Sequence, residues 1–227
     1  MDALWTDLEP KFVLAFWVTI KLTFFSALFS MVLGTVLTAM RVSPVAVLRG
    51  IANAYITVVR NTPLTLIVLF CSVGLYQNLG LALAPENENF IKNNNFWLAV
   101  LGFTLYTATF VAESLRSGIN TVHFGQAEAA RSLGLSFGQI FRAIVFPQAF
   151  RAAIVPLGNT LIALTKNTTI ASVIGVAEAS LLMKSTIENH ADQLFAVFGI
   201  FALGFIVLTL PIGLLVGSAA KRMAVRS

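Results

Sequence analysis

The sequence predicts an all-α integral membrane protein with five transmembrane helices, and two observations carry this prediction. The 227 residues are 57% hydrophobic and 11% charged, with a mean hydropathy of +0.84, whereas a soluble domain carries roughly 25% charged residues. The apolar residues also fall in long runs, and about 20 consecutive apolar residues can cross a bilayer core as a helix. We therefore expect one transmembrane domain, residues 1–227.

The first two spans are separated by an amphipathic stretch. Residues 12–40 are long enough to cross with tilt, and the Lys21 side chain within them is expected to reach the outer headgroups. Residues 44–59 place apolar and polar side chains on opposite helical faces, which is typical of a helix lying at the membrane interface. The expected apolar face consists of Leu48, Ile51, Tyr55 and Val58. The second span is expected at residues 63–84, with Pro63 in its first turn.

The third and last spans are expected at residues 96–115 and 194–217. A polar, asparagine-rich interval precedes the third span and reads as an external loop. Glu113 and Arg116 lie one turn apart at the other end of this span, which favours an ion pair at the membrane edge.

The fourth span is the ambiguous one. Residues 152–183 would form either two short crossings or one crossing that is broken near residues 166–169. With one crossing, nearly all basic residues share one side, and they are Arg41, Arg49, Arg60, Arg116, Arg131, Arg142, Arg151, Lys221, Arg222 and Arg226. Only Lys11, Lys92 and Lys184 then lie on the other side. Because cytoplasmic loops carry the excess of Lys and Arg, we expect five spans, the N-terminus outside and the C-terminus in the cytoplasm.

The most specific motif lies in the cytoplasmic loop expected at residues 117–150, between spans three and four. The residues that define this motif are Glu128, Ala129, Ala130, Gly134, Ile144 and Pro147. Gly134 suits the left-handed conformation that ends a helix, and Ser136 followed by Gln139 has the spacing of a capping box for a second helix. Pro147 would stop or kink that second helix. The small residues let another protein approach closely, so we expect a docking helix; the alternative is an amphipathic helix lying on the bilayer surface.

A polar cluster interrupts the apolar residues of the fourth span. It consists of Lys166, Asn167, Thr168 and Thr169. A charged side chain in hydrocarbon usually faces a bundle interior or a water-filled path, and a broken helix offers free backbone groups to a transported ligand. We expect this cluster to line a substrate pathway, with Asn61 and Thr62 as further contributors. Alternatively, Lys166 pairs structurally with Glu178 or Glu113.

Several function classes lack their sequence patterns. The chain contains no phosphate-binding Gly-rich loop with Lys and Ser/Thr, so it is not expected to bind ATP itself. No catalytic constellation or metal-ligand spacing is evident, and Cys71 is the only cysteine. The basic residues stand at the ends of apolar runs rather than in a patch, which does not indicate nucleic-acid binding. An enzyme is not expected.

The motif at residues 128–147 resembles the EAA loop of ABC importer permeases, which reads E-A-A, three residues, G, nine residues, I, one residue, L, P. Only the Leu differs, because Phe146 stands there. Other stretches resemble permeases of polar amino-acid importers, in particular the glutamate-uptake permeases of Gram-positive actinobacteria. They are residues 17–23, 60–64, 112–119, 166–169 and 172–176.

This resemblance implies a multi-pass permease in the cytoplasmic membrane of a bacterium, in contact with membrane lipid. It implies four kinds of partner: a second, non-identical permease; a dimer of cytoplasmic ABC ATPases, which bind the ATP; an extracytoplasmic substrate-binding lipoprotein; and an amino-acid substrate. In that family the EAA loop is the coupling helix that seats in a groove of the ATPase.

One departure from the family concerns the substrate. Many relatives read Lys-Asp-Thr-Ser where this chain has residues 166–169, so Asn167 replaces a carboxylate. We expect an acidic substrate, L-glutamate, unless selectivity resides wholly in the binding protein. A self-contained ion-coupled transporter or channel with its site at Lys166 is the alternative function, although it would not need an EAA loop. A membrane scaffold without a transport path is the third possibility.

Overall fold

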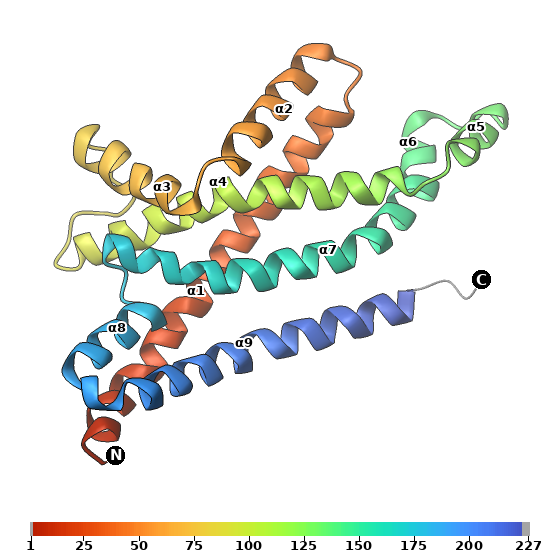
Figure 1. Ribbon diagram of the computed structural model, residues 1–227. Helices are drawn as coiled ribbons and strands as arrows, with labels where there is room; N and C mark the ends of the chain where they lie inside the picture. The colour runs from red at the N-terminus through yellow and green to blue at the C-terminus, as the bar shows by residue number, and fades with distance from the viewer. Residues whose placement is uncertain (1, 224–227) are drawn as a thin grey trace.

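The computed structural model describes the backbone of residues 2–223, and all regular elements in that range are helices (Figure 1). Side chains are described except at residues 2–7, 124, 127, 137 and 223. The α-helices are α1 (Asp2–Val42), α2 (Ala46–Arg60), α3 (Leu64–Leu69), α4 (Phe90–Asn120), α5 (Phe124–Ser132), α6 (Phe137–Ile140), α7 (Phe146–Asn167), α8 (Ala179–Asn189) and α9 (Leu194–Met223). Two π-helical segments (Phe70–Asn78 and Phe141–Val145) and two 3₁₀ segments (Thr168–Ile174 and Ala191–Gln193) extend or join them.

Four helical segments of the described chain are long and apolar enough to cross a bilayer. They are Leu8–Val42, Phe90–Asn120, Gly138–Ile174 and Ala191–Arg222. A fifth candidate is the pair Ala46–Arg60 and Leu64–Asn78, which passes the same test together but is bent by 103°. The structure therefore confirms an all-helical fold with four to five candidate spans.

The long helices form one connected assembly. In Figure 1, α4, α7 and α9 run side by side while α1 crosses them diagonally, and α1 packs on α4, α4 on α7, and α7 on α9. Helices α5 and α6 lie at one end, and the N-terminus, α3 and α8 lie toward the other. The two ends of the assembly thus carry different short helices.

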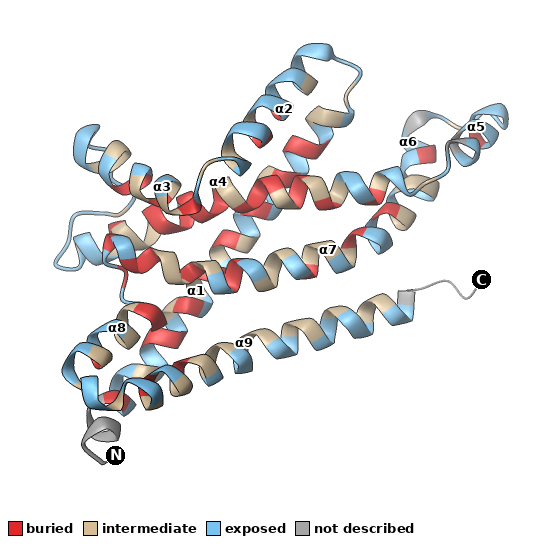
Figure 2. Ribbon diagram, viewed as in Figure 1, coloured by how far each residue is buried: buried red, intermediate tan, exposed pale blue. Residues whose placement is uncertain are grey.

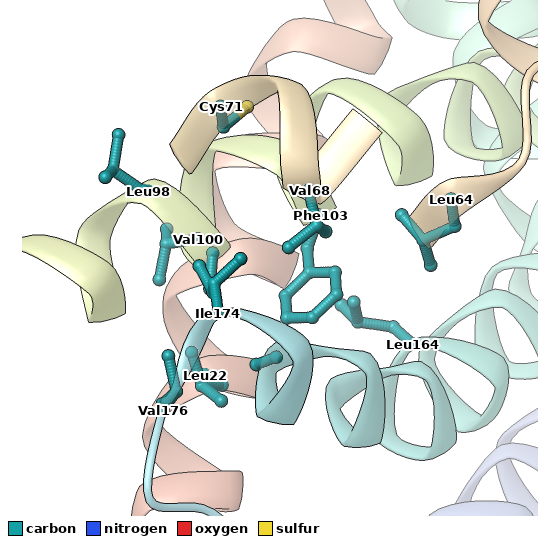
Figure 3. Close-up of a cluster of buried hydrophobic side chains, with 12 residues drawn as sticks. Leu22, Leu64, Val68, Cys71, Leu98, Val100, Phe103, Leu164, Ile174 and Val176 are labelled. Carbon is teal, nitrogen blue, oxygen red and sulfur yellow. The ribbon is translucent and has the colours of Figure 1, made fainter. Parts of the chain in front are cut away.

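The main core joins α1, α3, α4, α7 and the 3₁₀ segment Thr168–Ile174, which follows α7 (Figure 3). Phe103 of α4 is fully buried at its centre, and Leu22, Val68 and Leu164 surround it from three other helices. Lipid tails are as apolar as these side chains, so close van der Waals packing, rather than escape from water, holds such helices together.

Large apolar side chains remain uncovered along much of the molecule. Helix α9 shows this most clearly (Figure 2), with Phe195 88% exposed and Leu215 70% exposed. An apolar surface of this extent is not stable in water and marks contact with lipid or with another membrane chain. The pattern agrees with the high hydropathy of the sequence.

Helix α2 matches the expected amphipathic stretch, but it buries a different face. Ala52 and Ile56 pack against Ala108 of α4, and the Tyr55 hydroxyl donates to the Leu105 carbonyl at 2.9 Å. Ile51, which belongs to the expected apolar face, is 55% exposed. The helix therefore packs on the bundle rather than merely lying at an interface.

The second and fourth spans differ in length from their expected ranges. The segment expected at residues 63–84 is helical only to Asn78, and the chain turns at Gly80. The segment expected at residues 152–183 runs as α7 and its 3₁₀ continuation to Ile174, and the chain reverses at Gly175. The interruption near residues 166–169 is a change from α-helical to 3₁₀ winding, without a break in the helix.

Candidate functional site

Helix α5 ends in the glycine-capped turn that the motif predicts. Gly134 has φ of +81°, the left-handed conformation that a glycine adopts without steric cost. Its N–H donates to the Arg131 carbonyl at 2.9 Å, and the Leu135 N–H donates to the Ala130 carbonyl at 3.2 Å. Together these two bonds form a Schellman motif, which satisfies carbonyls that the helix end would leave unpaired.

The predicted capping box starts the next helix. The Ser136 N–H donates to the Gln139 side-chain oxygen at 2.9 Å, and the Gln139 N–H donates to the Ser136 hydroxyl at 3.4 Å. Helix α6 then passes into the π-helical turn and α7 without interruption. Pro147 does not stop the helix; it is the second residue of α7, which directly follows the π-helical turn Phe141–Val145.

The segment α5–α6 is hereafter called the coupling segment, after the role that the sequence predicts for it. The Gln148 side-chain N–H group donates to the Gln126 side-chain oxygen at 2.7 Å and to the Ile144 carbonyl at 3.0 Å. Ala130 is buried, whereas Glu128 and Ala129 are exposed. The segment therefore presents one face of α5 outward at the end of the bundle (Figure 1).

Only one residue of the polar cluster 166–169 lines a cavity. Asn167 lines a cavity of about 330 Å³ between α4 and α7, together with Tyr106, Asn159 and Thr160. Lys166 is exposed and does not line this cavity.

The threonines of the cluster bond within their own helix. The Thr168 hydroxyl donates to the Thr165 carbonyl at 2.7 Å, and the Thr169 hydroxyl donates to the Lys166 carbonyl at 2.8 Å. Neither hydroxyl group is therefore directed at the cavity, and Asn167 is the member of the cluster that reaches it.

Asn61 and Thr62 lie at the end of α2, and their side chains are likewise engaged locally. The Asn61 amide donates to the Thr57 carbonyl at 2.8 Å, and the Thr62 hydroxyl donates to the Val58 carbonyl at 2.9 Å. These bonds close the last turn of α2 before Pro63. Neither residue lines the cavity that holds Asn167.

A charged cluster that sequence reasoning missed joins three helices. Arg41 of α1 donates to the Glu113 carboxylate at 2.6 Å, and an Arg60 nitrogen lies 3.5 Å from the same oxygen. The ion pair expected between Glu113 and Arg116 is therefore wrong, and the alternative pairing of Glu113 with Lys166 is wrong as well. The partners lie too far apart in the chain for helical spacing to reveal them.

Arg60 also connects this cluster to the α4–α7 cavity. Its guanidinium lies 5.2 Å from the ring centroid of Phe110, a residue that lines the cavity. Glu178, the other partner considered for Lys166, instead caps α8 by accepting from the Ser180 and Leu181 N–H groups. Within the described residues, no group of three or more possible metal ligands comes together.

Comparison with known families defines the class of protein. Residues 10–225 match the family of binding-protein-dependent transport system inner membrane components. The chain belongs to this family, and it is an ABC importer permease of the inner membrane. This confirms the family expected from the EAA pattern.

Two relatives of high sequence identity are glutamate permeases. The chain is 73% identical over 227 residues, all of both chains, to the glutamate transport system permease protein GluC of Corynebacterium efficiens. It is 72% identical, again over the whole of both chains, to GluC of Corynebacterium glutamicum.

Solved structures agree on the fold. A chain of an amino acid ABC transporter, crystallised with histidines, is 30% identical and superposes with a TM-score of 0.83 over 96% of both chains. A chain of the inward-facing MetNI methionine ABC transporter is 17% identical, with a TM-score of 0.73 over 96% of this chain and 99% of that one. The second likeness concerns the fold alone.

Proposed function

We propose that this chain is the permease subunit of an ABC importer that carries L-glutamate across the cytoplasmic membrane of a bacterium. The observation that carries this proposal is the 73% and 72% identity to two glutamate permeases over their full length. In the proposed orientation the N-terminus lies outside, and the coupling segment and C-terminus lie in the cytoplasm. The distribution of Lys and Arg supports that orientation.

The proposed energy source is ATP hydrolysis by a separate ATPase dimer. The complex further contains a second, non-identical permease and an extracytoplasmic substrate-binding lipoprotein, and this chain has no catalytic role. We assign coupling to Glu128 and Ala129 on the exposed face of α5, with Ala130 and Gly134 fixing its shape. Ile144 and Pro147 continue the segment into α7. The small side chains and the exposure of this face support docking in a groove of the ATPase.

We assign part of the substrate pathway to Asn167 and the α4–α7 cavity. The described residues that line this cavity include amides and hydroxyl groups but no carboxylate. The Arg60 guanidinium lies 5.2 Å from the ring centroid of Phe110, which is one of the lining residues. Such a wall suits a substrate with an additional negative charge. Lys166, Thr168 and Thr169, together with Asn61 and Thr62, are proposed as flanking positions of the same path.

Asn167→Asp is predicted to reduce glutamate uptake and to weaken competition by aspartate relative to glutamine. The new carboxylate would repel an anionic substrate inside a poorly hydrated path, where like charges interact strongly. Initial uptake rates with each competitor would measure the effect. Asn159→Asp is a second variant that places a carboxylate on the wall of the same cavity. An unchanged rate and competition profile for Asn167→Asp would remove the assigned role in charge selection.

Deletion of the gene that encodes this chain tests the substrate directly. We expect the deletion to abolish high-affinity uptake of labelled glutamate by cells, and re-expression of the chain to restore it. Unlabelled aspartate should compete better than glutamine or arginine. Full glutamate uptake without the chain, or restored uptake of a different amino acid, would contradict the proposed substrate.

A further inference from the structure

A second cavity lies toward the opposite end of the bundle from the coupling segment. It has a volume of about 240 Å³ and lies between α1, α4 and the link that precedes α8. Two lysines line it, Lys21 of α1 and Lys92 of α4, together with Asn93 and the aromatic rings of Phe25, Phe96 and Trp97. Lys21 falls within residues 17–23, one of the stretches that resemble amino-acid permeases, whereas Lys92 and Asn93 lie outside those stretches.

Both lysines carry a charge that no described acidic side chain neutralises. Neither forms an ion pair with any residue that the structure describes, and the Lys21 nitrogen lies 5.8 Å from the ring centroid of Phe96. Glu178 directly follows Ala177, which lines the cavity, but Glu178 is fully buried and both its oxygens accept backbone N–H groups. Two ammonium groups on one cavity repel each other, and a bound anion would relieve this repulsion.

Contacts between aromatic rings join the walls around the lysines. Phe25 and Trp97 have ring centroids 5.1 Å apart, and Phe96 and Trp97 are 5.4 Å apart. The third wall is Val176 and Ala177. It follows Gly175, which has φ of +77° and ends the 3₁₀ segment.

Two hydrogen bonds fix this third wall. The Val176 N–H donates to the Ala171 carbonyl at 3.2 Å, and the Asn95 amide donates to the Ile174 carbonyl at 2.7 Å. Figure 3 shows Val176 beside Leu22, the residue that follows Lys21. A cavity with preset walls loses little conformational entropy when it binds a ligand.

We propose that this cavity is an outer anion subsite that receives a carboxylate of the transported amino acid. Lys21 and Lys92 pair with the carboxylate, Asn93 adds an amide, and the aromatic rings pack against the methylene groups of the cargo. This inference rests on the proposed function and membrane orientation. It places selection for negative charge in this subunit, in addition to any selection by the binding protein.

Equilibrium binding to the purified complex tests the proposal. The probe is radiolabelled L-glutamate, added to the complete permease–ATPase complex without the binding protein, in nanodiscs of phosphatidylcholine. We expect saturable binding that glutamine does not displace. Lys21→Gln and Lys92→Gln should each weaken it about tenfold, the scale of one lost charge-assisted hydrogen bond. Lys92→Arg should retain most of the affinity, and Lys221→Gln, an exposed lysine at the far end of α9, should have no effect.

The outcomes separate this inference from the proposed function. ATP-driven glutamate uptake is measured on the same complex with the binding protein added. Absence of this uptake in the wild-type complex would overturn the proposed function as a glutamate importer. Normal uptake without saturable glutamate binding, or binding that both lysine variants leave unchanged, would overturn the anion subsite alone. The anion subsite would also be overturned if the lysine variants differed from the wild type only in losing phosphatidylglycerol that copurifies with the complex. The lysines would then bind lipid headgroups. Size-exclusion profiles of each variant complex verify that it remains assembled.

Discussion

Gly134→Val is expected to abolish ATP-driven uptake while the protein still accumulates in the membrane. At φ of +81° a residue with a Cβ atom is strained by roughly 1–2 kcal/mol, and a β-branched residue is among the least tolerant. The strain would undo the Schellman turn and change the direction in which the chain leaves α5. Nothing lies within 4 Å of a Cβ atom built at Gly134, so the bundle itself should remain intact.

The matched control is Gly138→Val in the same segment. Gly138 also has open space around a Cβ atom but lacks a positive φ. Uptake and membrane abundance, measured side by side for both variants, report coupling and folding separately. Normal uptake by Gly134→Val, or an equal loss in both variants, would count against the specific role of the turn.

Gly118→Val is expected to cause the largest loss of stability. A Cβ atom at Gly118 of α4 would overlap the backbone carbonyl of Ala149 and lie 3.2 Å from the Ala153 side chain of α7. Backbone cannot yield as a flexible side chain can, so we expect destabilisation of about 3 kcal/mol, the upper part of the usual range for overpacking. Forcing α4 and α7 apart here would also move the attachment of the coupling segment.

The unfolding midpoint of the purified complex in detergent measures this effect. Gly217→Val is the matched control, because Gly217 lies in helix α9 and a Cβ atom there meets nothing within 4 Å. The control should unfold near the wild-type temperature. A midpoint for Gly118→Val equal to that of the control would show that the α4–α7 contact is looser than described.

Local sequence signals predicted the local structure of the candidate site well. Gly134 and the pair Ser136 and Gln139 act on backbone groups within a few residues, so their effect depends little on the rest of the fold. The all-helical membrane class followed from composition and from the lengths of the apolar runs. Orientation in the membrane and the functional roles of the site residues remain predictions.

Features that depend on contacts between residues far apart in the chain could not be predicted from local sequence patterns. Glu113 has a basic residue one turn away at Arg116, yet it pairs with Arg41 and Arg60 of two other helices. Helical spacing identifies neighbours on one helix only, whereas Arg41 and Arg60 are brought to Glu113 by the packing of α1 and α2 on α4. The same limit explains Lys166, whose exposure depends on how α7 rotates against α4.

Helix ends within the apolar runs were also not predictable from hydropathy. The second span was expected to residue 84 because the run stays apolar to Ala84, but the helix ends at Asn78 and Gly80 turns the chain. Hydropathy reports where a segment is apolar, whereas the turn is set by the conformation that Gly80 allows. Likewise, Gly175 rather than the polar residues 166–169 reverses the chain after α7.

Glutamate uptake into proteoliposomes, with each component omitted in turn, tests the central claim most directly. The vesicles would hold this chain, its partner permease and the ATPase, with the binding protein outside and ATP inside. Uptake is predicted to require ATP and every component, and acidic amino acids should compete best. Uptake by this chain alone under an ion gradient, without ATP or the ATPase, would contradict it.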